Sequence, residues 1–477
     1  MTVTLATYLC CVGILVLFWL DKEPQERTSK ALWIPVLWLW ITASREVSHW
    51  LVAFGATDQV TFSNVLDPNI EGSPLDRFVF TSLLVLGLTV LAVRGRRTLS
   101  LLRINLPILL FFAYCALSVG WSDFADVAFK RWIKALGDVV MIMVVLTDSN
   151  RLTAVKRLLA RAAFLLVPLS VLFIKYYPRI GRWYKSANGK PVYVGVATNK
   201  NLLGVLCLLF GLATLWRLLA MYRDRTNPKR IRHLVVHSLI LLMIFWLFAM
   251  ADSLTSLACF VLAGGLMAAT QLRTVVRRPA IVHVLVGIVV FASFVVLFFG
   301  ADPGALEAMG KDPTLTGRTQ VWDLCLSLGG NPLIGTGFES FWMGKRLEKI
   351  WSVYWWHPNE AHNGYIEVFL NLGWIGILLL GTLIVTGYRN VISSLKFNPQ
   401  LGRLLLAFFV VGVVYNFTEA GFRMLDPIWI SFLLSIMMVP KPLAKSTVPS
   451  RLVSQKEVAD ATPQLDHGVV VHMRECL

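Results

Sequence analysis

The feature that most constrains this sequence is a succession of uninterrupted apolar runs, each about 17–25 residues long, the length of helix that crosses a bilayer core. Only α-helices and closed β-barrels satisfy their backbone hydrogen bonds in lipid, and continuous rather than alternating runs exclude a barrel. Of the 477 residues, 56% are hydrophobic and 15% are charged, whereas soluble domains carry about 25% charged residues. The sequence therefore predicts an all-α, polytopic membrane protein.

Run length predicts a transmembrane helical bundle of about 12–13 spans, with one large extracytoplasmic loop before the last three. The expected spans are residues 3–20, 31–54, 77–93, 104–120, 132–147, 158–174, 201–219, 234–250, 255–272, 280–300, 364–387, 403–420 and 426–440. The expected divisions are helices with short loops over 1–300, the loop over 301–363, the last three helices over 364–440, and a disordered cytoplasmic tail over 441–477.

Positive charge is concentrated in loops that this span assignment places on one side of the membrane. The basic segments are residues 94–103, 150–161, 217–232, 273–278 and 388–403. Cytoplasmic loops of membrane proteins are rich in Lys and Arg, so this side is predicted to be cytoplasmic and the loop 301–363 to be external. The net charge of +17 is thereby explained, and nucleic acid is not an expected partner because no basic patch on a soluble fold is present.

The first candidate site lies in the external loop, where apolar residues recur at helical spacing over 316–328. Thr316 is suited to cap this helix, and the Gly329-Gly330-Asn331-Pro332 run to end it. We expect an amphipathic helix lying on the membrane surface. Arg318 falls in its first turn, where backbone N–H groups and a guanidinium together can hold an anion. The alternative is a solvated loop cation.

The second candidate is His362, which stands at the start of the next predicted span. A helix N-terminus is expected to lower the pKa of this imidazole and favour the neutral form, which accepts a proton. The alternative is an interfacial histidine bonded to backbone. His357 and His362 flank Pro358, which blocks the helix that a zinc-binding HExxH motif needs, so neither a metal nor a cofactor is expected.

Further candidates lie at other predicted external positions. Lys200, between two asparagines at the start of a span, forms a second corner suited to an anion. Asp252, at an external turn, is a candidate partner for a cation or a general base. Tryptophans of the loop form an interfacial belt or stack on sugar rings. The sugar-stacking candidates are Trp342, Trp355 and Trp356, and the supporting candidates are Asn201, Asn363, Asp252 and Glu367.

Four segments carry a resemblance to a known family. They are VGVATNKNLLG (194–204), LTGRTQVW (315–322), NPLIGTGFESFW (331–342) and AHNGYIEVFLNLGWIG (361–376). In this order the sequence resembles the O-antigen ligase and polymerase superfamily of bacterial membrane glycosyltransferases, and within it the exopolysaccharide polymerases of the succinoglycan type. In one place the sequence departs from the family pattern, because Leu254 stands where relatives often carry a basic residue.

The resemblance implies a metal-independent, inverting transfer at the periplasmic face of the bacterial inner membrane. It implies that His362 is the base and that Arg318 and Lys200 bind the pyrophosphate, with Arg131 as a further phosphate candidate. The implied partners are an undecaprenyl-pyrophosphate-linked oligosaccharide, membrane lipid, and a chain-length regulator and flippase of the same pathway.

The expected function is polymerisation of lipid-linked oligosaccharide repeat units into exopolysaccharide. One alternative is a ligase that transfers the lipid-linked glycan to lipid A core. Another is a polysaccharide or lipid transporter, which would place charged or broken-helix sites near the bilayer midplane. Here the notable groups instead lie near the predicted outer surface.

Overall fold

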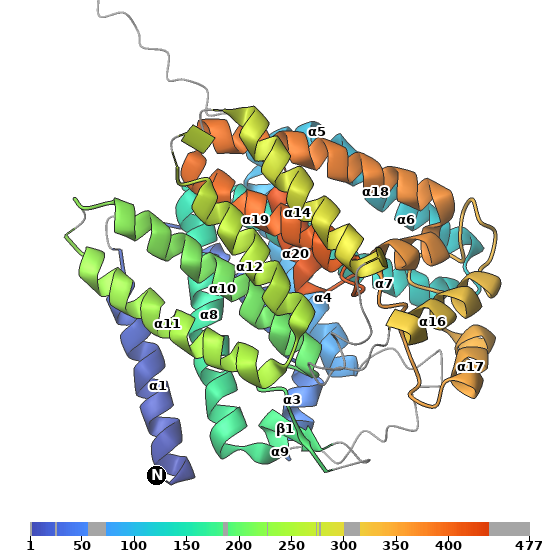
Figure 1. Ribbon diagram of the computed structural model, residues 1–477, viewed down its shortest axis with the longest axis horizontal. Coiled ribbons are helices and arrows are strands. Elements are labelled where there is room, and N and C mark those ends of the chain that lie inside the picture. Colours follow the sequence, from blue (N-terminus) through green and yellow to red (C-terminus); the bar gives the residue numbers. More distant parts are fainter. Residues whose placement is uncertain are drawn as a thin grey trace, which may run out of the picture. The chain divides into compact units, whose positions relative to one another are not determined.

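The apolar runs form helices in the computed structural model, which describes residues 2–23, 26–55, 73–184, 189–226, 228–272, 274–275, 278–299 and 315–437 (Figure 1). The helices are α1 (Val3–Leu20), α2 (Trp33–Thr42), α3 (Val47–Ala53), α4 (Pro74–Val93), α5 (Gly95–Ile104), α6 (Leu106–Ser118), α7 (Ala125–Leu146), α8 (Arg151–Tyr176), α9 (Pro178–Gly181), α10 (Lys200–Arg223), α11 (Arg230–Ala251), α12 (Leu254–Ala269), α14 (Pro279–Phe299), α16 (Leu315–Ser327), α17 (Gly344–Val353), α18 (Gly364–Phe397), α19 (Pro399–Tyr415) and α20 (Pro427–Ile436). Strands β1 (Arg182–Tyr184) and β2 (Pro191–Tyr193) pair antiparallel.

The all-α, multi-pass class predicted from the sequence is confirmed. Among the described residues, six helices are long and apolar enough to cross a bilayer, namely α1, α4, α8, α10, α11 and α18. Helices α5 and α6 meet at an 84° bend and make a seventh if the pair is one span. Every predicted span overlaps a helix, but several of these helices are short, so the number of crossings stays a prediction.

Burial separates central helices from peripheral ones. α10 is buried around most of its circumference and packs against α8, α11, α12 and α19. α1 buries only Ala6, Ile14 and Leu17, although most of its other residues are apolar. An apolar helix with an exposed apolar surface is stable only where lipid replaces water, so this pattern agrees with a membrane protein.

The loop before α18 has a small hydrophobic core of its own. α16 confirms the helix expected over 316–328, and its residues Val321 and Cys325 are buried against Phe341, Ile350 and Ala361. The expectation that this helix lies on the membrane surface stays a prediction, and part of its apolar face packs on the loop itself. Ile350 lies on α17 (Gly344–Val353), whereas Phe341 and Ala361 lie in irregular segments of the loop, where the sequence has no periodic pattern to reveal them.

Helix α18 is interrupted at Gly373, whose φ of 63° is outside the helical range. The carbonyl groups released there are taken up by the preceding loop. Thr336 N–H donates to the Leu370 carbonyl (3.1 Å) and Gly337 N–H to that of Asn371 (2.9 Å). Non-helical backbone at membrane depth is tolerated where protein satisfies it, so the break anchors the loop and leaves these two carbonyls occupied.

The tail predicted over 441–477 lies outside the described residues.

Candidate active site

Three segments far apart in the sequence meet beside the start of α18. They are the loop that ends at Asn363, the turn between α19 and α20, and the first turn of α10. Asn363 caps α18 by accepting from Tyr365 N–H (3.0 Å), and its side-chain amide donates to the Phe417 carbonyl (3.1 Å). A Cβ at Gly364 would collide with Asn416, so glycine permits the close approach of the loop and the turn. Asn363 is thus a structural residue that fixes its neighbour His362.

His362 lies between two carboxylates. Its Nδ1 is 3.0 Å from Glu360 Oε1 and 3.2 Å from Glu419 Oε2. The other oxygen of Glu360 accepts from Arg423 Nη1 at 2.9 Å, and Asn201 Nδ2 donates to Glu419 Oε2 at 3.4 Å. Because both neighbours of Nδ1 are acceptors, Nδ1 carries the hydrogen, which leaves Nε2 as the nitrogen able to accept a proton. His362 also has a positive φ of 50°, an uncommon conformation that surrounding contacts must hold.

The electrostatics of His362 differ from the sequence-based expectation. Burial lowers the pKa of His362, but the hydrogen bonds and charges of Glu360 and Glu419 outweigh it and raise the pKa to about 9. The prediction that the helix N-terminus keeps this imidazole neutral is therefore wrong, since two nearby carboxylates exceed the helix dipole. Burial raises the pKa of Glu360, yet His362 and Arg423 bring it down to about 2.

The cluster of Glu360, His362, Glu419 and Arg423, termed here the His362 cluster, borders a cavity of about 280 Å³. Glu360, Glu419 and Arg423 line it together with Asp426 and Asn201. Three carboxylates and one guanidinium make this cavity more acidic than basic. Carboxylates accept hydrogen bonds from hydroxyls, and a side-chain amide both donates to hydroxyls and accepts from them. The cavity is therefore chemically suited to a sugar.

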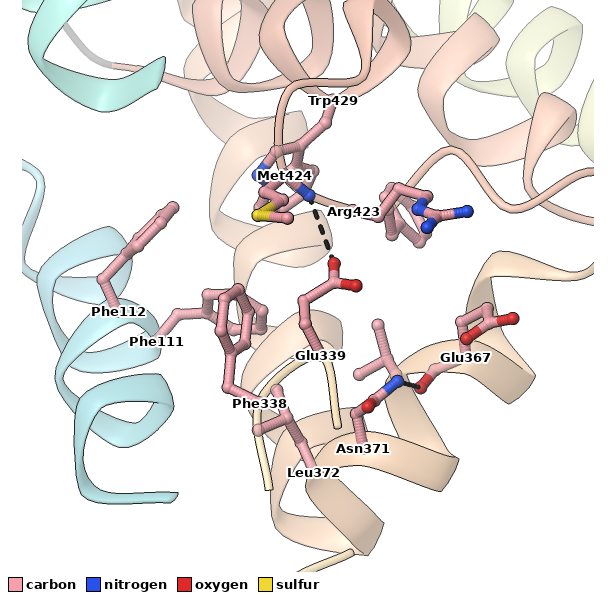
Figure 2. Close-up of a pocket in the computed structure, with 12 residues that line it drawn as sticks. Phe111, Phe112, Phe338, Glu339, Glu367, Asn371, Leu372, Arg423, Met424 and Trp429 are labelled. Carbon is pink, nitrogen blue, oxygen red and sulfur yellow. Dashed lines mark hydrogen bonds between the residues drawn. The ribbon is translucent and has the colours of Figure 1, made fainter. Parts of the chain in front are cut away.

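Arg423 also borders a smaller cavity of about 30 Å³ (Figure 2). Figure 2 shows Glu339 and Glu367 near Arg423, while the rings of Phe111 and Phe338 lie on the other side. The charges of Glu339, Glu360 and Glu367 hold the pKa of Arg423 above its usual range despite its burial. Arg423 is thus the positive centre of this acidic region.

The predicted supporting residues and Lys200, whose predicted role in binding pyrophosphate stays a prediction, are only partly brought together. Asn201 reaches the His362 cluster, whereas Lys200 is turned toward Asp252, with Nζ 3.9 Å from Oδ2. Both of these side chains are largely solvent-exposed. Glu367 is buried and accepts from Trp342 Nε1 at 2.9 and 3.0 Å.

The two arginines predicted to bind phosphate lie on different helices, Arg131 on α7 and Arg318 on α16. Arg131 Nη1 donates to the Glu339 carbonyl and contacts Met343 Sδ at 3.4 Å, so it fastens α7 to the loop. Arg318 is in the first turn of α16, and its side chain lies outside those that the structure describes. Their phosphate-binding roles stay predictions.

The three tryptophans proposed for sugar stacking have different surroundings. The Trp356 ring stacks beside that of His362, with centroids 6.2 Å apart and an interplanar angle of 29°, and Trp356 is 42% exposed. Trp355 is 87% exposed, and Trp342 is held by Glu367. Trp356 is therefore the one with an open face next to the His362 cluster.

The sequence reasoning missed Glu360, Glu419 and Arg423. The available signal was charge directly beside apolar spans, in the HPNEAHN and NFTEAGFR runs. An ionisable side chain at the edge of a membrane span that becomes buried needs a partner of opposite charge, so these residues were candidates for the site on the same ground as His362.

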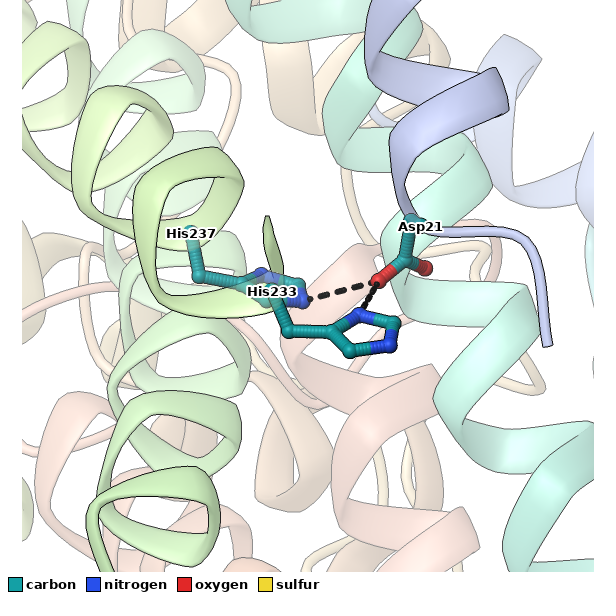
Figure 3. Close-up of side chains that lie close together, drawn as sticks. All are labelled: Asp21, His233 and His237. Atoms are coloured by element: carbon teal, nitrogen blue, oxygen red, sulfur yellow. Dashed lines mark hydrogen bonds and ion pairs between the residues drawn. The ribbon is translucent and has the colours of Figure 1, made fainter. Parts of the chain in front are cut away.

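A second polar cluster lies between α1, α10 and α11 (Figure 3). His233 Nδ1 and His237 Nε2, one turn apart on α11, lie 2.9 and 3.3 Å from the same oxygen of Asp21. Arg217 Nη2 is 3.4 Å from that oxygen and 3.1 Å from Glu23 Oε1. Burial raises the pKa of Asp21, but the hydrogen bonds of the histidines and the charge of Arg217 more than reverse this, so it stays ionised.

Two groups of described side chains have ligand atoms close enough together to hold a metal ion. They are Glu360, His362 and Glu419, and Asp21, His233 and His237, each set within 4.8 Å. In each case an arginine within 3.4 Å of a carboxylate already supplies positive charge. Neither site needs a cation for charge balance, and the metal-independent mechanism stays a prediction.

The helices and the polar clusters define a multi-pass helical membrane protein with a hydroxyl-compatible site in a loop-covered cavity. Residues 238–381 match the family model described as O-antigen ligase, a range that includes α11, α12, α14, α16, α17 and His362. The chain is also 26% identical over 381 residues to the exopolysaccharide production protein ExoQ of Rhizobium meliloti (strain 1021), covering 77% of this chain and 82% of that relative. Residues 238–381 are thus similar to O-antigen ligase, and the resemblance predicted from the sequence is confirmed. These matches indicate a membrane enzyme of polysaccharide biosynthesis.

Proposed function

We propose that the protein is an inner-membrane polymerase that joins undecaprenyl-pyrophosphate-linked oligosaccharide repeat units, with its active site on the periplasmic face. The observation that carries this proposal is the His362 cluster, in which two carboxylates orient the imidazole and also line an acidic, amide-bearing cavity. The exopolysaccharide production protein among its relatives supports polymer synthesis. A chain-length regulator and a flippase are the partners that such an activity calls for.

In the proposed step, an acceptor sugar hydroxyl attacks the anomeric carbon of the donor sugar. The new bond joins the hydroxyl oxygen to that carbon, and the bond from the carbon to the pyrophosphate oxygen breaks. The electron pair leaves with the lipid pyrophosphate, and the hydroxyl proton passes to His362 Nε2. Glu360 and Glu419 hold the Nδ1 hydrogen and stabilise the resulting imidazolium.

The proposed step requires the imidazole of His362 to be neutral before it accepts the proton. With a pKa of about 9, the neutral imidazole is present in about one molecule in a hundred at pH 7. A base of this strength accepts a proton readily once it is neutral, because proton affinity rises with pKa. Arg423 is the cation of the site that can meet the departing pyrophosphate, since it borders the cavity and is partly exposed.

The test is to supply purified protein with defined lipid-linked repeat units. The expected product is long glycan still attached to lipid pyrophosphate. Transfer that occurs only when lipid A core is added would instead identify a ligase, the second candidate, which the matching O-antigen ligase family model favours. Absence of either product, with transport of the lipid-linked unit across vesicles, would contradict both.

A further inference from the structure

A second cavity, of about 190 Å³, lies between α2, α4 and α7. Its cationic residues are Arg77, Lys130 and Lys134, and its apolar wall includes Phe80, Leu84 and Ile133. Arg77 is one turn into α4, and the two lysines are one turn apart on α7. Cations near the helix starts and apolar side chains deeper along α4 give the cavity the polarity of a phosphate-bearing lipid.

The two lysines have positive charge available for a ligand. Neither Lys130 nor Lys134 forms an ion pair with any residue that the structure describes, and Lys134 Nζ lies 5.8 Å from the centre of the Phe80 ring. The carboxylate of Asp76 is engaged by Ser48, whose N–H donates to it at 2.9 Å and whose hydroxyl also donates. Glu46 is the other carboxylate near Lys134. Among the residues that line this cavity, Arg77, Lys130 and Lys134 are cations and Asp76 is a carboxylate, whereas three carboxylates and one arginine line the His362 cavity.

The two cavities share a wall. Trp38 lines the basic cavity, and Thr42, one turn later on α2, lines the His362 cavity. Trp38 Nε1 donates to Asp138 Oδ1 at 2.8 Å, and Asp138 Oδ2 accepts from Leu425 N–H at 2.9 Å. Leu425 belongs to the turn that carries Arg423 and also lines the His362 cavity. A buried hydrogen-bonded chain therefore fixes the basic cavity relative to the His362 cluster.

Joining two lipid-linked units requires two phosphate-bearing lipids to be bound at once. The acceptor reacts at the sugar hydroxyl farthest from its own lipid, so its phosphate must lie outside the reacting cavity. A cavity with three carboxylates and one arginine is also a poor host for two pyrophosphates.

Resting on the proposed function, we infer that the cavity between α2, α4 and α7 binds the phosphate head of the acceptor lipid. Its phosphates contact Lys130 and Lys134. Its first isoprene units lie against Phe80, Leu84 and Ile133. The basic cavity is thus an acceptor-lipid site, separate from the donor's reacting end.

The test measures binding of undecaprenyl pyrophosphate to the full-length protein in nanodiscs, and separately the kinetics of polymerisation. For Lys130→Gln/Lys134→Gln we expect the number of bound equivalents to fall from two to one. We also expect the KM for lipid-linked repeat unit to rise at least tenfold, with kcat changed less than threefold. Lys130→Arg/Lys134→Arg should restore binding, because the charges return. The matched control is Lys345→Gln/Lys349→Gln on α17, where both lysines are exposed, and it should bind like the wild type.

Unchanged binding in Lys130→Gln/Lys134→Gln would overturn the inference. So would loss of the second equivalent when phosphatidylglycerol is added in stoichiometric amounts, because the cavity would then be a phospholipid site. The binding count does not depend on turnover. A His362→Ala protein that binds two equivalents but still makes polymer would count against the proposed base and leave the acceptor-lipid site standing.

Discussion

The protein has two clusters built from the same residue types at the two ends of α10. Asn201, in the first turn, reaches the His362 cluster, and Arg217, about 24 Å further along the helix, reaches Asp21. Each cluster combines two carboxylates, histidine and arginine. They differ in access, since the side chain of His362 is 22% exposed whereas those of His233 and His237 are 0% and 2% exposed.

This difference in histidine exposure gives the two clusters different proposed roles, one in the reaction and the other in attaching α1 to the bundle. Glu360, Glu419 and Arg423 of the His362 cluster line a cavity of about 280 Å³, and Nε2 of the partly exposed His362 is left to accept a proton. The Asp21 cluster joins the end of α1 to α10 and α11. Asp21 and Glu23 line a cavity of about 420 Å³, but the two histidines of the cluster are buried. Because α1 buries only three residues of its own, this attachment matters for its position. Under the proposed function, the exposure of the histidine rather than residue composition distinguishes the catalytic cluster from the structural one.

The largest expected effect is that of His362→Ala on turnover. Loss of the general base should lower the rate of polymerisation by about 10²–10⁴-fold, while the amount of folded protein in the membrane is unchanged. The measurement is polymer formed from lipid-linked repeat units by purified protein. His233→Ala is the matched control, and it should lower the midpoint of thermal unfolding while the folded fraction keeps its activity. Unchanged turnover in His362→Ala together with lost turnover in His233→Ala would contradict the roles assigned to the two clusters.

Arg217→Met should have the largest effect on stability. It removes the cation that lies between Asp21 and Glu23, and an uncompensated buried charge costs about 3–5 kcal/mol. Thermal unfolding in detergent measures the loss, and Arg223→Met, at the exposed end of the same helix, serves as the control. A midpoint equal to that of the wild type would mean that the cluster does not hold α1.

The same cluster predicts the response of stability to acid. The folded-state pKa of Asp21 is lowered, so its stabilising contribution is complete above the pKa of the unfolded chain and is lost as pH falls. Asp21→Asn should therefore flatten the acid side of a plot of unfolding midpoint against pH. If the unfolding midpoint of Asp21→Asn falls with decreasing pH as steeply as that of the wild type, groups other than Asp21 cause the loss of stability in acid.

The sequence predicted the membrane class, a helix for each apolar run, and both His362 and Asn201, which the fold brings to one cluster. These predictions rest on local patterns, which apolar run length and helix termini express directly. It did not predict Glu419 or Arg423 as neighbours of His362, because they come from a turn about 60 residues later. For the same reason it gave the wrong direction for the His362 pKa, since the helix dipole is local and Glu419 is not.

A smaller effect is expected on the pH dependence of the reaction. The carboxylates raise the pKa of His362 to about 9, so kcat/KM should rise with pH up to about that value as Nε2 loses its proton. Glu360→Gln removes the negative charge of one of the two acceptors of Nδ1 and should move the midpoint of this rise down by about one pH unit. Glu419→Gln should act in the same direction, and Arg423 remains in both variants. Glu23→Gln, in the Asp21 cluster, is the control and should not move the midpoint.

The smallest expected effect is that of metal removal, which compares the two clusters most directly because both have ligand atoms within 4.8 Å. Arg423 and Arg217 already supply the positive charge that a divalent ion would bring. Dialysis against a chelator should therefore leave both polymer formation and the thermal midpoint unchanged. Lost activity that Mg²⁺ or Zn²⁺ restores would place a cation between Glu360, His362 and Glu419. A lowered midpoint that metal restores, and that His233→Ala makes insensitive to metal, would instead place it beside Asp21. Either result would replace arginine with a metal ion as the charge that balances that cluster.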